Sequence, residues 1–182
     1  MVKKLNDWEN TTAFTGTFQS LPAGGYICKI IKVKTEENNG RERLAIAFDI
    51  ADGEYVDFFY RDFNAKKAKD ADAKWPAGGM HYQYTTTQDG KCNGFFKGMI
   101  ENIKASNPQF VWDWDETSLH GMLFGGLFGR EEYIGNDGKA HWSTKCQKFL
   151  PVEGITEMAA PKDKPLNNGG LSQQGMDEEI PF

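Results

Sequence analysis

Cysteine, histidine and long apolar runs are all scarce in this sequence, and each shortage excludes a class of protein. The three cysteines, Cys28, Cys92 and Cys146, lie far apart with no CxxC spacing, which indicates idle thiols in a reducing compartment rather than disulfides or a metal site. No stretch approaches the ~18 apolar residues that span a membrane, and "MVKKLNDWENTT" has no apolar run after its lysines. We therefore expect a cytoplasmic protein without a membrane segment, metal or cofactor.

Catalytic motifs are also missing. The three histidines lack partners at ligand spacing, and the sequence holds no P-loop, no Gly-x-Gly-x-x-Gly cradle and no Ser/His/Asp order. The glycines of "LFGGLFG" are more simply explained by bending of a strand, because the "REEY" that follows would repel phosphate. The carboxylates of "WDWDE" at residues 112–116 are explained by a solvated turn. No catalytic residue is assigned, and we expect a protein that is not an enzyme.

Composition and charge favour one mainly β domain. The chain has 182 residues, enough for one domain of about 100–150 residues plus extensions. Its 39% hydrophobic and 13% aromatic residues can build a core, and its 20 glycines with many short apolar runs favour strands over long helices. The formal net charge of −5 argues against indiscriminate attraction to polyanions, but a locally basic groove remains compatible with nucleic acid.

The first half of the chain predicts a three-stranded meander after an N-terminal arm at residues 1–23. "YICKIIKVKTEE" alternates apolar and polar residues with one slip at Ile30 and Ile31, the pattern of a long strand with a bulge. "ENNGRE" predicts a turn, "RLAIAFDI" a second strand, and "YVDFFYRDF" a third. Residues 64–91 predict mostly loop with some helix, with "MHYQYTTT" as a further short strand.

The second half predicts a helix and a hairpin. "FFKGMIENIKASNP" places apolar residues at helical spacing and stops before a proline. "SLHGMLFGGLFGREEYIG" and "AHWSTKCQKFLPV" predict two strands joined at an Asp-Gly turn. The order β-β-β-α-β-β over residues 24–156 is that of the OB-fold, a five-stranded Greek-key barrel. The composition of residues 157–176 predicts a flexible linker, followed by an acidic tip at residues 177–182.

Basic and aromatic residues alternate along the predicted strands, as a single-stranded nucleic-acid groove requires. The alternative is that the aromatics form the core and the basic residues protect sheet edges. In "YVDFFYRDF" either Phe58 and Tyr60 or Phe59 and Arg61 would face outward, because a slip of one residue exchanges the two sets. The candidate DNA-binding residues are Tyr26, Lys32, Lys34, Arg41, Arg43, Phe58, Tyr60, Arg61, Trp75, Tyr82, Tyr84, Lys139, Trp142 and Lys145.

The chain ends in "DEEIPF", whose parts have separate physical uses. Phe182 can enter an apolar pocket for about 2–3 kcal/mol, and the carboxylates before it can steer the peptide toward a basic rim. This ending resembles the acidic tips of bacterial and bacteriophage single-stranded DNA-binding proteins. The residues that carry the resemblance are Asp177, Glu178, Glu179, Ile180, Pro181 and Phe182.

The resemblance implies both a fold and a role. Two stretches of the body, "FFKGMIENIKASNPQF" and "LFGGLFGREEYIGNDGK", are similar to phage-encoded single-strand-binding-like proteins. The family has an OB-fold and coats single-stranded DNA during replication, recombination or repair, and its tip docks the enzymes of those processes. The resemblance thus implies a sequence-independent single-stranded DNA-binding protein of bacterial cytoplasm, encoded by a bacterium or a phage, and leaves a homo-oligomer open.

Two other functions remain open at this point. One is a strand-annealing recombination accessory protein, which would share the DNA-binding groove. The other is a protein-interaction adaptor built on an OB-like barrel. The weakly acidic composition favours the adaptor, whereas the basic and aromatic residues of the strands favour DNA binding.

Overall fold

The computed structural model describes residues 3, 6 and 20–166. Most of the expected N-terminal arm, the second part of the linker and the whole acidic tip at residues 177–182 therefore lie outside the described residues. The elements, with 3-10 helices labelled η, are β1 (Gly24–Asn38), β2 (Arg41–Ile50), α1 (Phe58–Lys67), η2 (Ala77–Gly79), β3 (Met80–Tyr84), α2 (Gly94–Ser106), η3 (Glu116–Leu119), β4 (Leu123–Ile134), β5 (Ala140–Leu150) and η4 (Ile155–Glu157).

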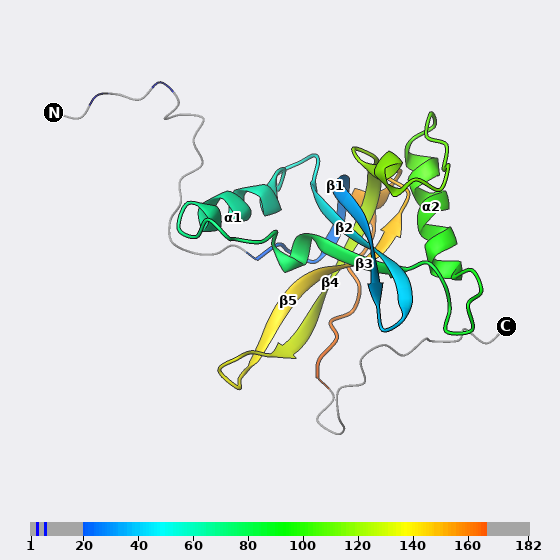
Figure 1. Cartoon of the computed structure of the whole chain (residues 1–182). Helices are drawn as coiled ribbons and strands as arrows, with labels where there is room; N and C mark the ends of the chain where they lie inside the picture. The colour runs from blue at the N-terminus through cyan, green and yellow to red at the C-terminus, as the bar shows by residue number, and fades with distance from the viewer. Residues whose placement is uncertain (1–2, 4–5, 7–19, 167–182) are drawn as a thin grey trace.

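The protein is mainly β, with a five-stranded antiparallel sheet in the order β3-β2-β1-β4-β5 (Figure 1). The long central strand β1 pairs with β2 over most of its length and with β4 over its first residues. Its register with β2 shifts between Ile30 and Lys32, which confirms the predicted bulge. The β1–β2 turn contains Asn39 and Gly40, both at positive φ, as a tight hairpin requires.

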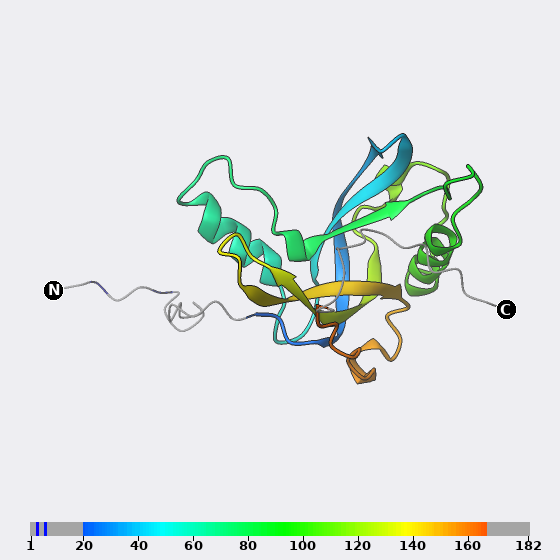
Figure 2. The ribbon, with the colours of Figure 1, turned by 90° about the horizontal axis from the view of Figure 1, so that it is seen from below.

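The edge strands β3 and β5 approach each other without pairing among the described residues. The ring of His81 on β3 lies 4.7 Å from the ring of Phe149 on β5, measured between centroids. The sheet is therefore strongly curled but open. In Figures 1 and 2, α1 and α2 lie at opposite ends of this curled sheet.

The predicted third strand at residues 55–63 is wrong, because residues 55–57 form a turn and residues 58–63 form the first part of α1. The start of this helix is fixed by a residue outside the segment. The buried carboxylate of Asp49 on β2 accepts hydrogen bonds from the backbone N–H groups of Phe59 (2.9 Å) and Tyr60 (2.8 Å). These are N–H groups that a helix start leaves without partners. Asp49 therefore caps α1 from a neighbouring strand, which no local pattern reveals.

The third strand of the sheet is instead β3, the short segment that the sequence offered as an extra strand. The helix predicted after it is confirmed as α2. Asn93 caps α2, since its side-chain oxygen accepts a hydrogen bond from the backbone N–H of Phe95 at 2.9 Å. The four apolar residues at helical spacing, Phe96, Met99, Ile100 and Ile103, are all buried.

The core is rich in phenylalanine and centres on Phe48 of β2. Its ring makes edge contacts with Phe59, Phe124, Phe128 and Phe149, at centroid distances of 5.4–6.1 Å. Residues of α1, β4 and β5 therefore meet at one residue of β2. Such edge-to-face pairs add about 0.5–1.5 kcal/mol each beyond area burial.

Glycines in β1 and β4 let the segment around η4 pack directly on the sheet. A Cβ at Gly25 would lie 1.8 Å from the carbonyl oxygen of Ile155, and one at Gly125 would lie 2.4 Å from that of Pro151. Bending of a strand is what the sequence predicted at "LFGGLFG", and at Gly125 the structure shows close approach of another backbone.

Residues 157–166, the first part of the expected linker, continue along the free edge of β4. The backbone N–H of Lys164 donates to Arg130 O and that of Glu132 donates to Lys164 O, both at 2.9 Å. Asp163 also pairs with Arg130 at 3.3 Å. The start of the linker is thus attached to the sheet. No helix among the described residues is long and apolar enough to cross a membrane.

Candidate nucleic-acid interface

The register of three strands brings six of the candidate residues onto one surface. Directly paired residues point to the same side of a sheet, and Ala45 of β2 pairs with both Lys34 of β1 and Tyr82 of β3. The opposite side of β2 is buried in the core. We call this surface the outer face. Its members are Lys32, Lys34, Glu36, Asn38, Arg41, Arg43, Tyr82 and Tyr84.

Two arginine–tyrosine stacks form the centre of the outer face. The Arg41 guanidinium carbon lies 3.9 Å from the centroid of the Tyr84 ring, and that of Arg43 lies 4.3 Å from the centroid of Tyr82. Both distances are within the range of a cation–π interaction. Tyr82 remains 49% exposed. A planar group can therefore stack against the ring or the guanidinium from the solvent side.

Hydrogen bonds fix these side chains in place. The Tyr84 hydroxyl donates to Asn38 Oδ1 at 2.7 Å, and Arg43 Nε donates to Glu36 Oε1 at 2.8 Å. Lys34 Nζ lies 3.7 Å from the second oxygen of Glu36. The outer face thus carries four cationic side chains against the one carboxylate of Glu36. Beside the Tyr84 stack is an open depression of about 850 Å³, lined by Asn38, Asn39, Gly40, Arg41, Arg43, Tyr84 and Gln88.

Four other candidates lie on α1 or the loop after it. Tyr60 and Arg61 are exposed on α1, whereas Phe58 is partly buried against Tyr55 and Phe59. Trp75 holds the loop: its ring packs on Phe63, and its Nε1 donates to the Gly79 carbonyl at 3.1 Å. These residues belong to a different element from the outer face.

Tyr26 packs against the core. Its ring makes edge contacts with Tyr55 and Phe128, and its hydroxyl donates to the Pro22 carbonyl at 2.8 Å. Burial, with smaller contributions from nearby acidic groups, raises the pKa of Tyr26 to about 12. Its ring is therefore occupied by structural contacts.

The last three candidates lie on the β4–β5 hairpin and do not share a surface. Trp142 and Lys145 have opposite parity in a continuous register, so they point to opposite sides of the hairpin. Lys145 pairs with Glu131 at 3.6 Å, and Lys139 is exposed at the turn. Arg130 lies over the Trp142 ring, 4.8 Å from its centroid.

Three residues that form or support these stacks were not among the candidates expected from the sequence: Glu36, Asn38 and Arg130. Glu36 and Asn38 share the parity of Lys32 and Lys34 on β1, so alternation along the strand could have identified them. Arg130 reaches Trp142 across the hairpin, and finding it requires the register of β4 with β5.

Metal-binding side chains do not gather in the described part of the chain. No three His, Cys, Asp or Glu side chains come together there in a metal-binding group. Burial raises the pKa of the Cys28 thiol well above its usual value and that of Cys146 to about 12. Both thiols are therefore protonated and unreactive near neutral pH.

No protein-family model matches this chain, and no curated protein matches it.

Proposed function

We propose that the protein binds single-stranded DNA, without dependence on sequence, through the outer face. The observation that carries the proposal is the pair of stacks, Arg41 on Tyr84 and Arg43 on Tyr82, beside two exposed lysines. Stacking of a base on an aromatic side chain contributes about 1–3 kcal/mol and tolerates any base. Lys32 and Lys34 lie on the neighbouring strand, where they can contact the phosphates between stacked bases.

The same features favour a single strand over a duplex. In a duplex the base faces are covered by their neighbours, so the tyrosine rings and guanidiniums would have no partner. A single strand can turn its bases toward the protein while its phosphates meet the lysines. The negative net charge of the whole chain limits nonspecific attraction to any polyanion.

We also propose that the fold is an OB-fold and that the acidic tip recruits partner enzymes. An OB-fold is supported by the pairing of β1 with both β2 and β4, by α2 between β3 and β4, and by the approach of β3 to β5. We infer from the sequence that residues 177–182 recruit enzymes of DNA replication, recombination or repair. In this arrangement, DNA and partner enzymes use separate parts of the chain.

The test is a fluorescence anisotropy titration of labelled oligo-dT with three variants. Tyr82→Ala and Tyr84→Ala should each weaken binding by about 1–3 kcal/mol. Tyr60→Ala on α1 is the matched control, because Tyr60 and Tyr82 are tyrosines of similar exposure, 52% and 49%. The control should bind like the parent protein. Equal losses in all three variants would show that the outer face is not the site.

Salt and strand preference provide a second criterion. With four cationic side chains on the outer face, the slope of log K against log salt should approach about −3 for a single strand. The affinity for a duplex of the same length should be clearly lower. A chain that binds duplex and single strand equally, or neither, at low salt would contradict the proposed function.

A further inference from the structure

The loop between α2 and η3 exposes large apolar side chains that the outer face does not use. Val111 is 76% exposed and Trp114 is 77% exposed. Contiguous exposed apolar groups on a soluble protein commonly mark an interaction site. We call Val111, Trp112 and Trp114, with the adjacent acidic residues Asp113, Asp115 and Glu116, the Trp114 patch.

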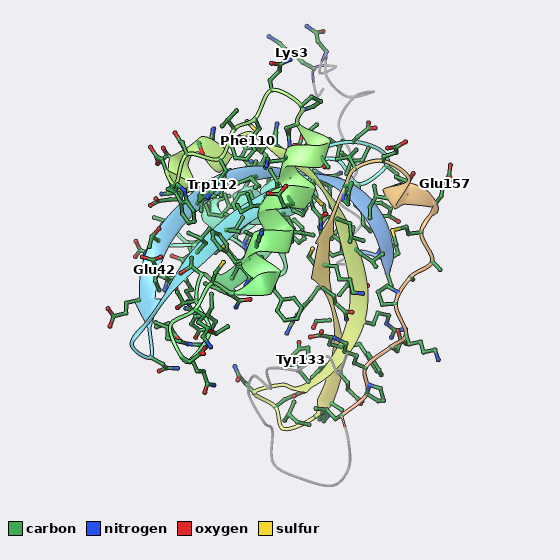
Figure 3. All side chains as sticks on the ribbon, turned by 90° about the vertical axis from the view of Figure 1, so that its right-hand side faces the viewer. Lys3, Glu42, Phe110, Trp112, Tyr133 and Glu157 are labelled. Carbon is green, nitrogen blue, oxygen red and sulfur yellow. The ribbon has the colours of Figure 1, made fainter. Side chains whose placement is uncertain are left out.

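The Trp114 patch rests on the core. The Trp114 ring lies 6.0 Å from the Trp112 ring, which in turn lies 6.1 Å from the ring of Phe96, a buried residue of α2. Figure 3 shows Trp112 and Phe110 close together beside α2. The exposed indole of Trp114 thus packs on Trp112, which packs on the core. A side chain held in this way loses little conformational entropy on binding, as suits a binding anchor.

The backbone on both sides of Trp114 is also held. Trp114 itself has a φ of 68°, which is unusual for a bulky residue. Asp113 Oδ1 accepts a hydrogen bond from the backbone N–H of Asp115 at 3.2 Å, and Asp115 Oδ1 accepts one from that of Thr117 at 2.9 Å. The backbone that carries the Trp114 indole is therefore held by hydrogen bonds within the loop.

The charge around the Trp114 patch determines which partner fits. Three carboxylates lie within residues 113–116, and the sequence has no lysine or arginine between Lys104 and Arg130. This patch would repel the phosphates of nucleic acid. It would also repel the same patch of a second copy, because a two-fold interface places identical surfaces against each other. A cationic protein surface is complementary to it.

We propose that the Trp114 patch docks a basic segment of a partner protein in which arginines alternate with aliphatic residues. An arginine can stack on the exposed indole of Trp114 and pair with the carboxylates beside it. An aliphatic side chain covers Val111. The proposal does not depend on the outer face or on the C-terminal tip, so it stands or fails separately from DNA binding.

The test uses the full-length protein and a labelled peptide of alternating arginine and leucine as the probe. We expect micromolar binding in anisotropy titrations. Trp114→Ala should weaken it about tenfold, whereas Tyr133→Ala should leave it unchanged. Tyr133 is a suitable control because it is 45% exposed and lies far from Trp112 in Figure 3. A combined Asp113→Asn, Asp115→Asn and Glu116→Gln variant keeps the capping oxygens of the two aspartates and should also weaken binding.

Three results would overturn the proposal. Equal peptide affinity in Trp114→Ala, Tyr133→Ala and the parent would mean that the peptide responds only to the overall negative charge. Loss of oligo-dT binding in Trp114→Ala, with peptide binding retained, would assign the patch to nucleic acid. Self-association that Trp114→Ala abolishes, measured by light scattering in the absence of peptide, would assign it to a second copy of the chain.

Discussion

His81 lies on β3 with its ring against Phe149 of β5, at the place where the two edge strands approach. Burial lowers its pKa from 6.5 to about 4, with a smaller opposing effect from the side chain of Gln83. In the unfolded chain His81 takes up a proton near pH 6.5, whereas in the native protein it does so only near pH 4. The native state is therefore stabilised by neutral His81 above pH 6.5, and this stabilisation is lost as the pH falls to about 4.

We expect His81 to account for about 3 kcal/mol of stability loss over that pH range. The measurement is urea unfolding at a series of pH values for the parent and for His81→Leu. Carboxylates also titrate at the acid end, so the difference between the two proteins is the relevant quantity. That difference should change between pH 6.5 and 4. Parallel pH curves would show that His81 is not protonated on unfolding.

Glu36 is the single carboxylate among the cations of the outer face. It accepts hydrogen bonds from Arg43 and lies within 3.7 Å of Lys34. If the outer face binds phosphate, Glu36→Gln should raise the affinity for oligo-dT several-fold at low salt, by about 0.5–1 kcal/mol for one removed negative charge.

Glu37→Gln is the matched control for this change. Glu37 follows Glu36 directly on β1 and therefore points to the other side of the sheet. It should change the affinity much less than Glu36→Gln in the same anisotropy titration. Equal gains from both variants would indicate a general effect of net charge and not a contact on the outer face.

At the scale of elements, sequence patterns succeeded where each element is specified by its own residues. The slip at Ile30 and Ile31 predicted the bulge in β1, and the spacing of apolar residues after Gly94 predicted α2. The pattern of "YVDFFYRDF" failed because its aromatic residues suit a strand, while its helical state depends on Asp49. A long-range hydrogen bond of this kind leaves no trace in the local sequence.

The candidate site likewise contains residues that the local sequence predicts and residues whose placement depends on distant parts of the chain. Lys32, Lys34, Arg41 and Arg43 are found from strand alternation, because their strands were predicted correctly. Their grouping with Tyr82 and Tyr84 depends on β3 pairing with β2, which the sequence left undecided. Phe58, Tyr60 and Arg61 were proposed as members of a strand that does not form, so their place on α1 could not be foreseen.

Asp49 is the basis of a prediction about α1. Burial raises the pKa of Asp49. The hydrogen bonds that its carboxylate accepts from three backbone N–H groups lower that pKa, but by less. Asp49→Ala leaves these donors without a partner and should cost about 2–4 kcal/mol of unfolding free energy. Urea unfolding measures the loss, and hydrogen exchange should show reduced protection in residues 58–67.

The control for this prediction is Asp52→Ala, which removes an exposed aspartate from the turn between β2 and α1. It should change the unfolding free energy by less than about 0.5 kcal/mol. Asp49→Asn keeps one acceptor oxygen and should fall between the two. If Asp49→Ala and Asp52→Ala have the same effect, the capping role assigned to Asp49 is wrong.

For the molecule as a whole, the path of residues 157–166 sets where the rest of the tail begins. The composition of this segment predicts a flexible linker, yet the segment hydrogen-bonds to the edge of β4 and donates from Leu166 N–H to Glu132 at 2.9 Å. A partner held by residues 177–182 would therefore be tethered from the β4–β5 hairpin, which also carries the Arg130–Trp142 stack.

Two truncations test whether this attachment is part of the fold. A chain ending at Leu166 keeps the hydrogen bonds between Lys164 and β4, so its unfolding free energy should equal that of the full chain. A chain ending at Ala160 loses them and should be less stable by about 1–3 kcal/mol. It also exposes the edge of β4, and free edges promote pairing between chains, so light scattering should detect self-association. Equal stability of the two truncated chains, with both monodisperse, would show that residues 161–166 contribute nothing to the sheet.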